Sequence, residues 1–498
     1  MGTELMTSRS VDLKGQLHLR VRSEPLSTEG PPYSARALDQ SLLDHFRCPE
    51  CFFDFALTDK LSSDTAHFRF GTNATCYGRF CGGNRDPHDQ SLRDDVLDNV
   101  VIHDGKVYLP FDPAEVIDNL RLERYVENHR SSEILRRIYY HLRPLTTLSI
   151  RKRIQRFRAR NWRDLSFPQW PVDTTVENMC ATLLLLALQA KRVTSVPFVW
   201  FWPRSALGCV MMTHDVESEA GLGFCNELMD IDDSFGIKAS FQIVPEERYT
   251  ASSHLIDTIR NRGFEVSIQD LNHDGRLFDN KQEFLRRVSI VNQYAKKYKA
   301  KGFRAGVLYR RPDWYDNLDF SFDMSMPNVA HLDPQGGGCC TVMPYFIGRI
   351  LELPVTTTQD YTLFHILNQR SIDLWKTQIE LILQKNGLAS FIVHPDYIIE
   401  QETRSVYKNL LSHLSDLRSH ANIWFALPSE IDSWWRTRSQ LRVERCGGSW
   451  RIVGEGAERA TLAYAKNVDG KLVYELARSS GGDEYESSKE STITSPLV

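Results

Sequence analysis

Three short apolar runs, each followed by an acid or a histidine, constrain the fold of this chain more than any other feature. Residues 209–212 lead into Thr213-His214-Asp215-Val216-Glu217, residues 264–268 lead into Gln269-Asp270-Leu271-Asn272-His273, and residues 389–393 lead into His394. Open α/β sheets and α/β barrels place catalytic groups at the carboxyl ends of such strands. The three runs therefore predict parallel strands with reactive side chains along one edge.

Strand-like and helix-like segments alternate through the same part of the chain. Predicted strands cover residues 209–213, 239–244, 265–268, 302–304, 350–353, 388–393 and 423–427. Predicted helices cover residues 221–235, 253–262, 281–299, 372–384 and 403–420. Alternation at this pitch implies parallel strands joined by right-handed crossovers.

The flanking regions have a different character. After Trp434-Trp435-Arg436, short strand-like runs alternate with Gly-rich turns, which predicts a small antiparallel appendix with a hairpin turn at Asp469-Gly470. The first residues are polar, and the last are rich in Ser, Gly and Glu. We expect a flexible arm (1–37), an N-terminal region (38–200), a catalytic barrel (201–435), a β appendix (436–478) and a disordered tail (479–498).

The N-terminal region contains two cysteine pairs in an irregular segment between residues 38 and 110. Cys48-Pro-Glu-Cys51 has zinc-knuckle spacing, whereas Cys76-Tyr-Gly-Arg-Phe-Cys81 is looser than usual. Together the four thiols either bind a structural zinc or are ordinary buried thiols.

Residues 113–165 predict helices, as do residues 176–191. The first of these regions carries a basic run from residue 150 to residue 163, made up of Arg151, Lys152, Arg153, Arg156, Arg158, Arg160 and Arg163. Such a run suits phosphates or lipid headgroups, and the alternative is a solvated helix face.

Composition bounds the class of protein. With 42% hydrophobic and 25% charged residues the chain is of ordinary globular type, and its net charge of -4 gives no global case for nucleic acid or an anionic membrane. The N-terminus lacks the apolar core of a signal peptide, and no run approaches the roughly 18 apolar residues of a membrane span. Ten cysteines without a secretion signal indicate reduced thiols. We therefore expect a cytoplasmic protein with no membrane span and no nucleic-acid partner.

Side chains at the predicted strand ends suggest chemistry. Asp215 and Glu217 are two residues apart and share a face, so they could act as base and metal ligand, or as a helix cap and a surface acid. His273 lies four residues after Gln269, a spacing at which two histidines would clamp a metal, although glutamine is a poor zinc ligand. His394 is either a general acid or a core histidine.

Taken in order, these segments resemble the NodB-like polysaccharide deacetylases, carbohydrate esterase family four in the broad sense. The resemblance covers roughly residues 205–430, and its five motifs correspond to residues 213–217, 269–275, 302–310, 320–325, and 353–354 with 392–397. The chain departs from the family at Val216, where most members have a second Asp, and at Gln269, where they have a histidine. Asp-Val-Glu is typical of a divergent branch. A proline expected near Gly306 is also missing.

The resemblance implies an irregular (β/α) barrel of the polysaccharide deacetylase type, with the mainly helical N-terminal region and β appendix attached. It implies Asp215 as general base, Arg304 as the group that orients it, and His394 as general acid. It further implies substrate contacts from Tyr309 and Asp323. The metal ligands would be Glu217, His273 and Gln269, holding a divalent ion, zinc by the resemblance, only weakly.

The function expected on this basis is metal-assisted N-deacetylation of an amino sugar or glycoconjugate in the cytoplasm. Two alternatives remain open. One is a metal-free hydrolase of non-peptide C–N bonds on the same fold. The other is a carbohydrate-binding protein that lost catalysis when position 269 became glutamine.

Overall fold

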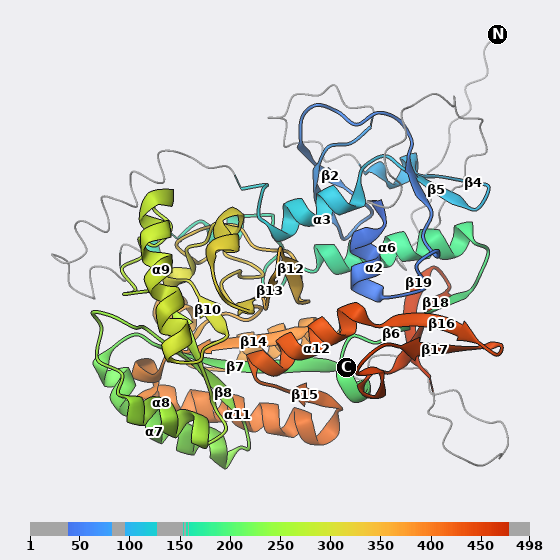
Figure 1. Ribbon diagram of the computed structural model, residues 1–498. Coiled ribbons are helices and arrows are strands. Elements are labelled where there is room, and N and C mark those ends of the chain that lie inside the picture. Colours follow the sequence, from blue (N-terminus) through green and yellow to red (C-terminus); the bar gives the residue numbers. More distant parts are fainter. Residues whose placement is uncertain (1–37, 82–94, 127–152, 154–155, 158, 478–498) are drawn as a thin grey trace, which may run out of the picture.

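The computed structural model of the chain describes residues 38–81, 95–126, 153, 156–157 and 159–477 (Figure 1). The expected arm (1–37) and tail (479–498) lie outside the described residues, as do Arg151, Lys152 and Arg158 of the basic run. Of the helices within the described ranges, none has both the length and the apolarity needed to cross a bilayer.

A curled, mostly parallel sheet forms the centre of the molecule. Its order is β12-β13-β11-β10-β9-β8-β7-β14, with β15 also paired to β7, and only β12 runs antiparallel to its neighbour. The strands are β7 (Gly208–Val216), β8 (Ala239–Ile243), β9 (Glu265–Gln269), β10 (Gly302–Arg304), β11 (Phe322–Asp323), β12 (Tyr345–Ile347), β13 (Ile350–Glu352), β14 (Leu388–Val393) and β15 (Ile423–Phe425). The predicted parallel α/β arrangement is confirmed.

The segment after β13 bridges the two edges of the sheet. Val355 pairs in parallel with Pro327, beyond the end of β11. Two residues later, Thr357 donates from its backbone N–H to the Ser390 carbonyl of β14, at 3.2 Å. The Thr356 hydroxyl also bonds the Leu388 carbonyl and the Ser390 N–H, at 2.6 and 2.9 Å. These contacts close the curled sheet into an irregular (β/α) barrel, as expected.

Helices surround the barrel, and three more lie in the described part of the N-terminal region. They are α2 (Gln40–Phe46), α3 (Pro113–Arg121), α6 (Thr175–Ala190), α7 (Glu219–Ser234), α8 (Ser253–Asn261), α9 (Lys281–Lys297), α10 (Asp373–Leu383), α11 (Gln401–His420) and α12 (Pro428–Gln440). Figure 1 shows α7, α8 and α11 together on one side of β7 and β8. Four of these helices begin at capping side chains, Asp112 for α3, Ser218 for α7, Ser252 for α8 and Asn280 for α9, each of which accepts a backbone N–H of the first turn.

The N-terminal region contains short strands that the sequence did not predict. They are β1 (Phe55–Leu57), β2 (Ala66–Arg69), β3 (Thr75–Gly78), β4 (Val101–His103) and β5 (Lys106–Leu109). The order β1-β5-β4 makes one sheet, and β2 pairs with β3. The strands have only three or four residues each, which is too short for a clear alternating pattern.

The four N-terminal cysteines do not gather into a metal site. Cys48 and Cys76 are buried in the hydrophobic core, Cys51 is exposed, and all ten cysteines of the chain are free thiols. Within the described residues, the group that brings three potential metal-ligating atoms together consists of Asp215, Glu217 and His394. Ordinary thiols are therefore the interpretation that the structure supports.

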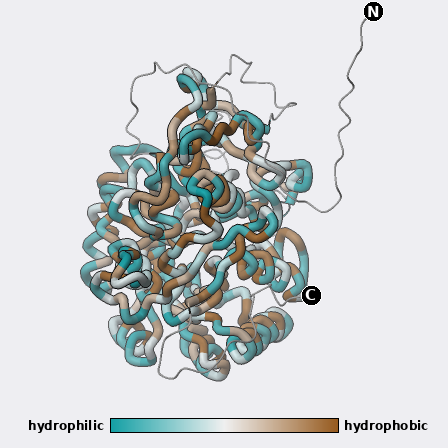
Figure 2. The backbone as a smooth tube through the Cα atoms, turned by 90° about the vertical axis from the view of Figure 1, so that its right-hand side faces the viewer, coloured by the Kyte–Doolittle hydropathy of each residue, from teal (hydrophilic) through white to brown (hydrophobic). Residues whose placement is uncertain are grey.

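The C-terminal strands form two antiparallel pairs, β16 (Arg442–Cys446) with β17 (Ser449–Val453) and β18 (Leu462–Val468) with β19 (Lys471–Leu476). The second pair is not a separate appendix, because β18 also pairs with β6 (Ser195–Val199), which precedes the barrel. One hydrophobic cluster accordingly contains residues of the N-terminal region, β6 and the C-terminal strands. Figure 2 shows hydrophilic segments along the outer helices and loops.

Candidate active site

The carboxyl ends of β7, β9, β10 and β14 bring together a group of six side chains, which we call the site cluster: Asp215, Glu217, Gln269, His273, Arg304 and His394. Asp215 is nearly fully buried, with one carboxylate oxygen 2.5 Å from Nη1 of Arg304. The same nitrogen donates to the Thr213 hydroxyl at 2.8 Å, and Arg304 Nε donates to the Met324 carbonyl. The guanidinium is thus fixed from three sides and holds Asp215 in one orientation.

Glu217 lies at the centre of the cluster, close to three side-chain nitrogen atoms. Its Oε1 lies 2.9 Å from the amide nitrogen of Gln269, 2.8 Å from Nε2 of His273 and 3.4 Å from Nε2 of His394. Burial would raise the pKa of the Glu217 carboxyl, but the two histidines hold it well below its usual range. Glu217 is therefore ionised and surrounded by nitrogen atoms.

The loop after β9 presents His273 to Glu217 in a strained conformation. Asp270 and His273 both have positive φ, 55° and 54°. Gly306, after β10, permits this close approach, because a Cβ atom there would lie 2.4 Å from a carboxylate oxygen of Asp270 and 3.1 Å from the His273 ring. Positive φ at residues other than glycine is typical of functional loops.

Arg248 fixes the protonation of the His273 ring. Its Nη2 lies 3.3 Å from Nδ1 of His273 and also donates to the His273 carbonyl, while its Nε donates to the Asn272 carbonyl. A guanidinium only donates hydrogen bonds, so Nδ1 of His273 must be the acceptor. The ring proton of neutral His273 is consequently on Nε2, which faces Glu217 at a distance of 2.8 Å but without hydrogen-bond geometry.

His394 follows β14 and is bound on two sides by Asp360. One Asp360 oxygen accepts from Nδ1 at 2.6 Å, and the other accepts from the His394 backbone N–H at 2.7 Å. Burial would lower the pKa of His394, but the charges of Asp360 and Glu217 outweigh it and hold the pKa well above 6.5. His394 is thus an imidazolium at neutral pH.

Three aromatic rings adjoin His394, and we refer to Tyr361, His365 and Tyr397 as the aromatic group. Tyr397 lies in the short helix η8 (Pro395–Ile398), and its ring centroid is 4.7 Å from that of His394. Tyr361 and His365 lie 5.6 and 5.1 Å from Tyr397. His365 belongs to a π-helical turn, η7 (Thr362–Ile366). All three rings are partly exposed, and π-helical turns are frequent at functional sites.

The two residues expected to contact substrate are placed differently. Asp323 is fully buried and accepts from the Ser325 hydroxyl and backbone N–H. It faces Glu352 on the adjacent strand, and burial together with Asp323 raises the pKa of Glu352 well above its usual value. Asp323 therefore belongs to a second, structural carboxyl pair. Tyr309 is 5% exposed and follows the turn η5 (Gly306–Leu308).

The predicted zinc ligands do not present lone pairs to a common point. The amide nitrogen of Gln269 lies between the two carboxylates, 3.1 Å from Asp215 and 2.9 Å from Glu217, so N–H groups already fill the position that a cation would take. A metal-bound histidine normally donates its other ring N–H, which His273 cannot do towards Arg248.

A second possible set of metal ligands consists of Asp215, Glu217 and His394. The liganding atoms of Asp215, Glu217 and His394 lie within 4.8 Å of one another, and the Asp360 contact to His394 is of the kind that supports a metal-bound histidine. However, the Arg304 guanidinium already pairs with the Asp215 carboxylate. Two buried atoms of the cluster, Gln269 Oε1 and His273 Nε2, have no hydrogen-bond partner in the described residues. With the Gln269 amide nitrogen between the carboxylates and Arg304 paired to Asp215, the cluster as folded does not offer a divalent ion a set of free oxygen and nitrogen lone pairs.

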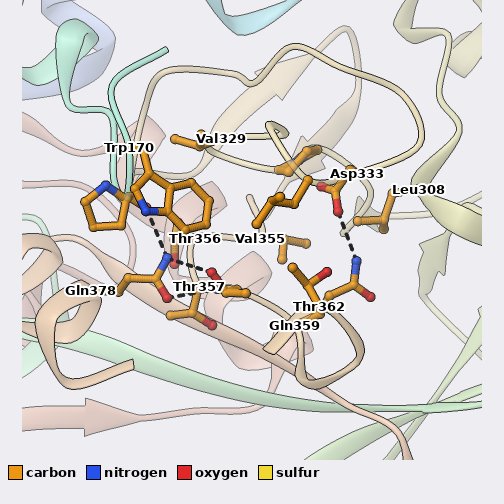
Figure 3. Close-up of a pocket in the computed structure, with 14 residues that line it drawn as sticks. Trp170, Leu308, Val329, Asp333, Val355, Thr356, Thr357, Gln359, Thr362 and Gln378 are labelled. Carbon is orange, nitrogen blue, oxygen red and sulfur yellow. Dashed lines mark hydrogen bonds between the residues drawn. The ribbon is translucent and has the colours of Figure 1, made fainter. Parts of the chain in front are cut away.

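A cavity of about 30 Å³, enough for a water molecule or two, opens on the same face of the barrel. Trp170 and Gln378 line one side of it, and Leu308 and Asp333 line the other (Figure 3). Gln359, on its wall, directly precedes Asp360. The N-terminal region therefore contributes a wall beside the site through Trp170.

Sequence reasoning missed Asp360, Arg248 and the aromatic group. Asp360 lies outside any strand, and Arg248 lies in a loop after β8, so neither occupies the strand-end position that marked the other residues. A surplus of tyrosine and histidine around residues 361–365 and 397 was the available signal.

Comparison with known proteins gives structural likenesses only, because no protein-family model and no curated protein matches the chain. Similar solved structures include a Mycobacterium smegmatis protein assigned as a polysaccharide deacetylase, with 17% identity over 48% of this chain and 93% of that one, at a TM-score of 0.39. The allantoinase PuuE has 12% identity over 47% and 92% of the chains, at 0.37. The peptidoglycan deacetylase PdaC from Bacillus subtilis has 11% identity over 46% and 93%, at 0.31. Because the TM-scores are below 0.5, no function is inferred from these likenesses.

Proposed function

We propose that this chain hydrolyses a non-peptide C–N bond, the N-acetyl group of an amino sugar, without a bound metal ion. The observation that carries the proposal is the pairing of a fixed carboxylate with a protonated histidine. The reactive atoms of Asp215 and His394 lie within 4.8 Å of each other, across Glu217. That separation allows one group to act on a water molecule and the other on the leaving nitrogen of the same amide.

Asp215 is the proposed general base. Its Oδ1 is bound to Arg304 and its Oδ2 accepts only from the Gln269 amide, a neutral group that a substrate water can compete with. Arg304 keeps the carboxylate ionised and correctly oriented. Asp215 would take the proton of the attacking water as the tetrahedral centre forms.

His394 is the proposed general acid. An amine leaves an amide only when it receives a proton, and the imidazolium beside Asp360 carries one at neutral pH. The Nε2–H of His273, a buried donor without a hydrogen bond, would stabilise the developing oxyanion.

The substrate class follows from the motif resemblance and from the aromatic group. Partly exposed rings beside His394 suit the apolar face of a sugar ring, because aromatic side chains bury a large area there.

Acetate release from N-acetylglucosamine, its oligomers and its nucleotide conjugate tests the proposal. Asp215→Asn keeps the shape of the side chain but cannot accept a proton, so turnover should fall by a factor on the order of 10² to 10⁴. Asp313→Asn, at an exposed position of the turn η6 (Pro312–Asn317), is the matched control and should keep full activity. Near-normal turnover of Asp215→Asn would contradict the assignment of the base.

Chelation tests the metal-free part separately. Turnover should be unchanged after exhaustive treatment with a strong chelator, because no step depends on an ion. If chelation abolishes turnover and zinc restores it, the enzyme is a hydrolase of metal-dependent type. If no acetylated sugar is turned over, the carbohydrate-binding alternative becomes the better interpretation.

A further inference from the structure

A long acid-free stretch precedes the barrel. Between Glu133 and Asp164 the sequence contains no aspartate or glutamate. Its basic residues are Arg136, Arg137, Arg143, Arg151, Lys152, Arg153, Arg156, Arg158, Arg160 and Arg163. In a chain with a net charge of -4, so much positive charge in one segment is a local property.

The described part of this stretch combines exposed arginines with exposed apolar side chains. Arg153, Arg156, Arg160 and Arg163 are all exposed. Phe157 is 66% exposed and Leu165 is 51% exposed, the two highest values among the large hydrophobic residues of the described ranges. We call these six residues the basic-apolar surface.

Two of these arginines pack on aromatic rings. The Arg160 guanidinium lies 4.3 Å from the Phe157 ring centroid, and that of Arg163 lies 4.9 Å from the Trp162 ring centroid. None of the four arginines forms an ion pair with any residue in the part of the chain that the structure describes. Their charge is therefore available to an external anion.

The basic-apolar surface lies at the rim of the candidate active site. Arg156 donates from Nε to the His365 carbonyl at 2.8 Å. The His365 ring is 5.1 Å from the Tyr397 ring, which in turn lies 4.7 Å from His394. A binding partner that covered the basic-apolar surface would therefore also lie next to the aromatic group.

We propose that the basic-apolar surface docks the protein on an anionic lipid bilayer. Arginines attract acidic headgroups, while partly inserted aromatic and aliphatic side chains bury apolar area at the acyl boundary. A nucleic acid would use the same charge, but it offers little to Leu165, an aliphatic side chain that does not stack on bases. The combination of four exposed arginines with Phe157 and Leu165 favours the lipid surface.

Co-sedimentation of the full chain with vesicles tests the proposal. The vesicles are phosphatidylcholine alone, or phosphatidylcholine with phosphatidylglycerol, at physiological ionic strength. The charge variant is Arg153→Gln with Arg160→Gln and Arg163→Gln, and the apolar variant is Phe157→Ser with Leu165→Ser. The matched controls are Arg442→Gln with Arg445→Gln and Arg451→Gln, and Leu285→Ser with Val468→Ser, which change equally exposed residues elsewhere.

The wild type should bind the anionic vesicles, and not the neutral ones. Binding should weaken by roughly 100-fold in the charge variant, at about fivefold for each arginine, and by about tenfold or more in the apolar variant. Both controls should bind like the wild type, and unchanged circular dichroism shows that every variant is folded.

Three results would overturn the proposal. The first is no binding of the wild type to anionic vesicles. The second is an equal loss of vesicle binding in each variant and its matched control, which would show that binding depends on overall charge and apolarity and not on the basic-apolar surface. The third is tight binding to a single-stranded oligonucleotide that the charge variant loses and the apolar variant keeps, which would assign the surface to nucleic acid.

Discussion

Asp360 is the residue on which the proton of His394 depends. A charged histidine donates below its pKa, so the alkaline limit of activity should lie well above pH 6.5, where the raised pKa of His394 places it. Asp360→Asn removes one of the two carboxylates and should move the alkaline limit of kcat/KM to lower pH, by about one unit or more. The pH profile measures this shift.

Asp373→Asn, at the exposed start of α10, is the control and should keep the alkaline limit in place. If the profile of Asp360→Asn were unchanged, Asp360 would serve the backbone N–H of His394 alone, and the proton donor would have to be sought elsewhere.

Arg248 and Gln269 together should decide whether zinc binds. Gln269→His alone should gain little affinity, because Arg248 still holds the acceptor nitrogen of His273. Arg248→Gln with Gln269→His supplies an acceptor for Nδ1–H and a second imidazole, so zinc should bind on the order of 10- to 100-fold more tightly than in the single variant. Competition with a coloured chelator measures the affinity without reference to activity.

Arg248→Gln alone is the control, and it should resemble the wild type. If Gln269→His increased zinc affinity equally with and without the Arg248 change, Arg248 would not determine which nitrogen of the His273 ring is free to bind zinc.

At the scale of the secondary-structure elements, a network of buried polar side chains joins β7 and β14 to α7 and α11. His214 bonds the Asp232 carboxylate of α7 at 2.9 Å and lies 3.2 Å from the Val393 carbonyl, one residue before His394. The Tyr407 hydroxyl of α11 donates to the other Asp232 oxygen at 2.6 Å. This network fixes the strand end from which His394 projects.

Tyr407→Phe should therefore lower the free energy of unfolding by about 1–3 kcal/mol, because it leaves a buried carboxylate oxygen without its donor. Tyr294→Phe is the matched control, since its hydroxyl bonds Glu246 in a more exposed position, and it should cost about 0.5 kcal/mol or less. Urea unfolding measures both. An equal effect of the two changes would mean that the Asp232 network adds nothing to stability.

The sequence predicted most of the barrel's strands and helices, because apolar runs mark the strands and several helices begin at capping residues, but it did not predict β11, β12 or α12. The predicted segment 302–304 coincides with β10, and 388–393 with β14. The site residues at strand ends were found for the same reason, since position alone marks them. Asp360, Arg248 and β6 could not be found in this way, because their roles arise from contacts between segments far apart in the chain.

At the scale of the whole molecule, a buried ion pair joins the N-terminal region to the barrel. Glu123, just beyond α3, binds the Arg310 guanidinium through both carboxylate oxygens, one of them at 2.8 Å from Nε. Both side chains are buried, and the pair adjoins the loop in which Glu123 also accepts the Gly338 N–H. The two regions should therefore unfold together.

Glu123→Gln should destabilise the protein by about 3–5 kcal/mol, because it leaves the Arg310 charge buried without its partner. Glu444→Gln, which removes an exposed pair with Arg442, is the control and should cost about 1 kcal/mol or less. Thermal unfolding measures both. Two separate transitions in the wild type would contradict the view that the regions form one cooperative unit.

The pairing of β6 with β18 has a consequence for biosynthesis. β6 is almost entirely buried, yet Val199 finds its partner only at Leu462, near the end of the described chain. A ribosome releases the N-terminal residues first, so β6 and the aromatic side chains around it must wait for most of the polypeptide to be made. During that interval an apolar strand with an open edge is exposed to other chains. This sheet should therefore be completed only after the C-terminal strands have been synthesised.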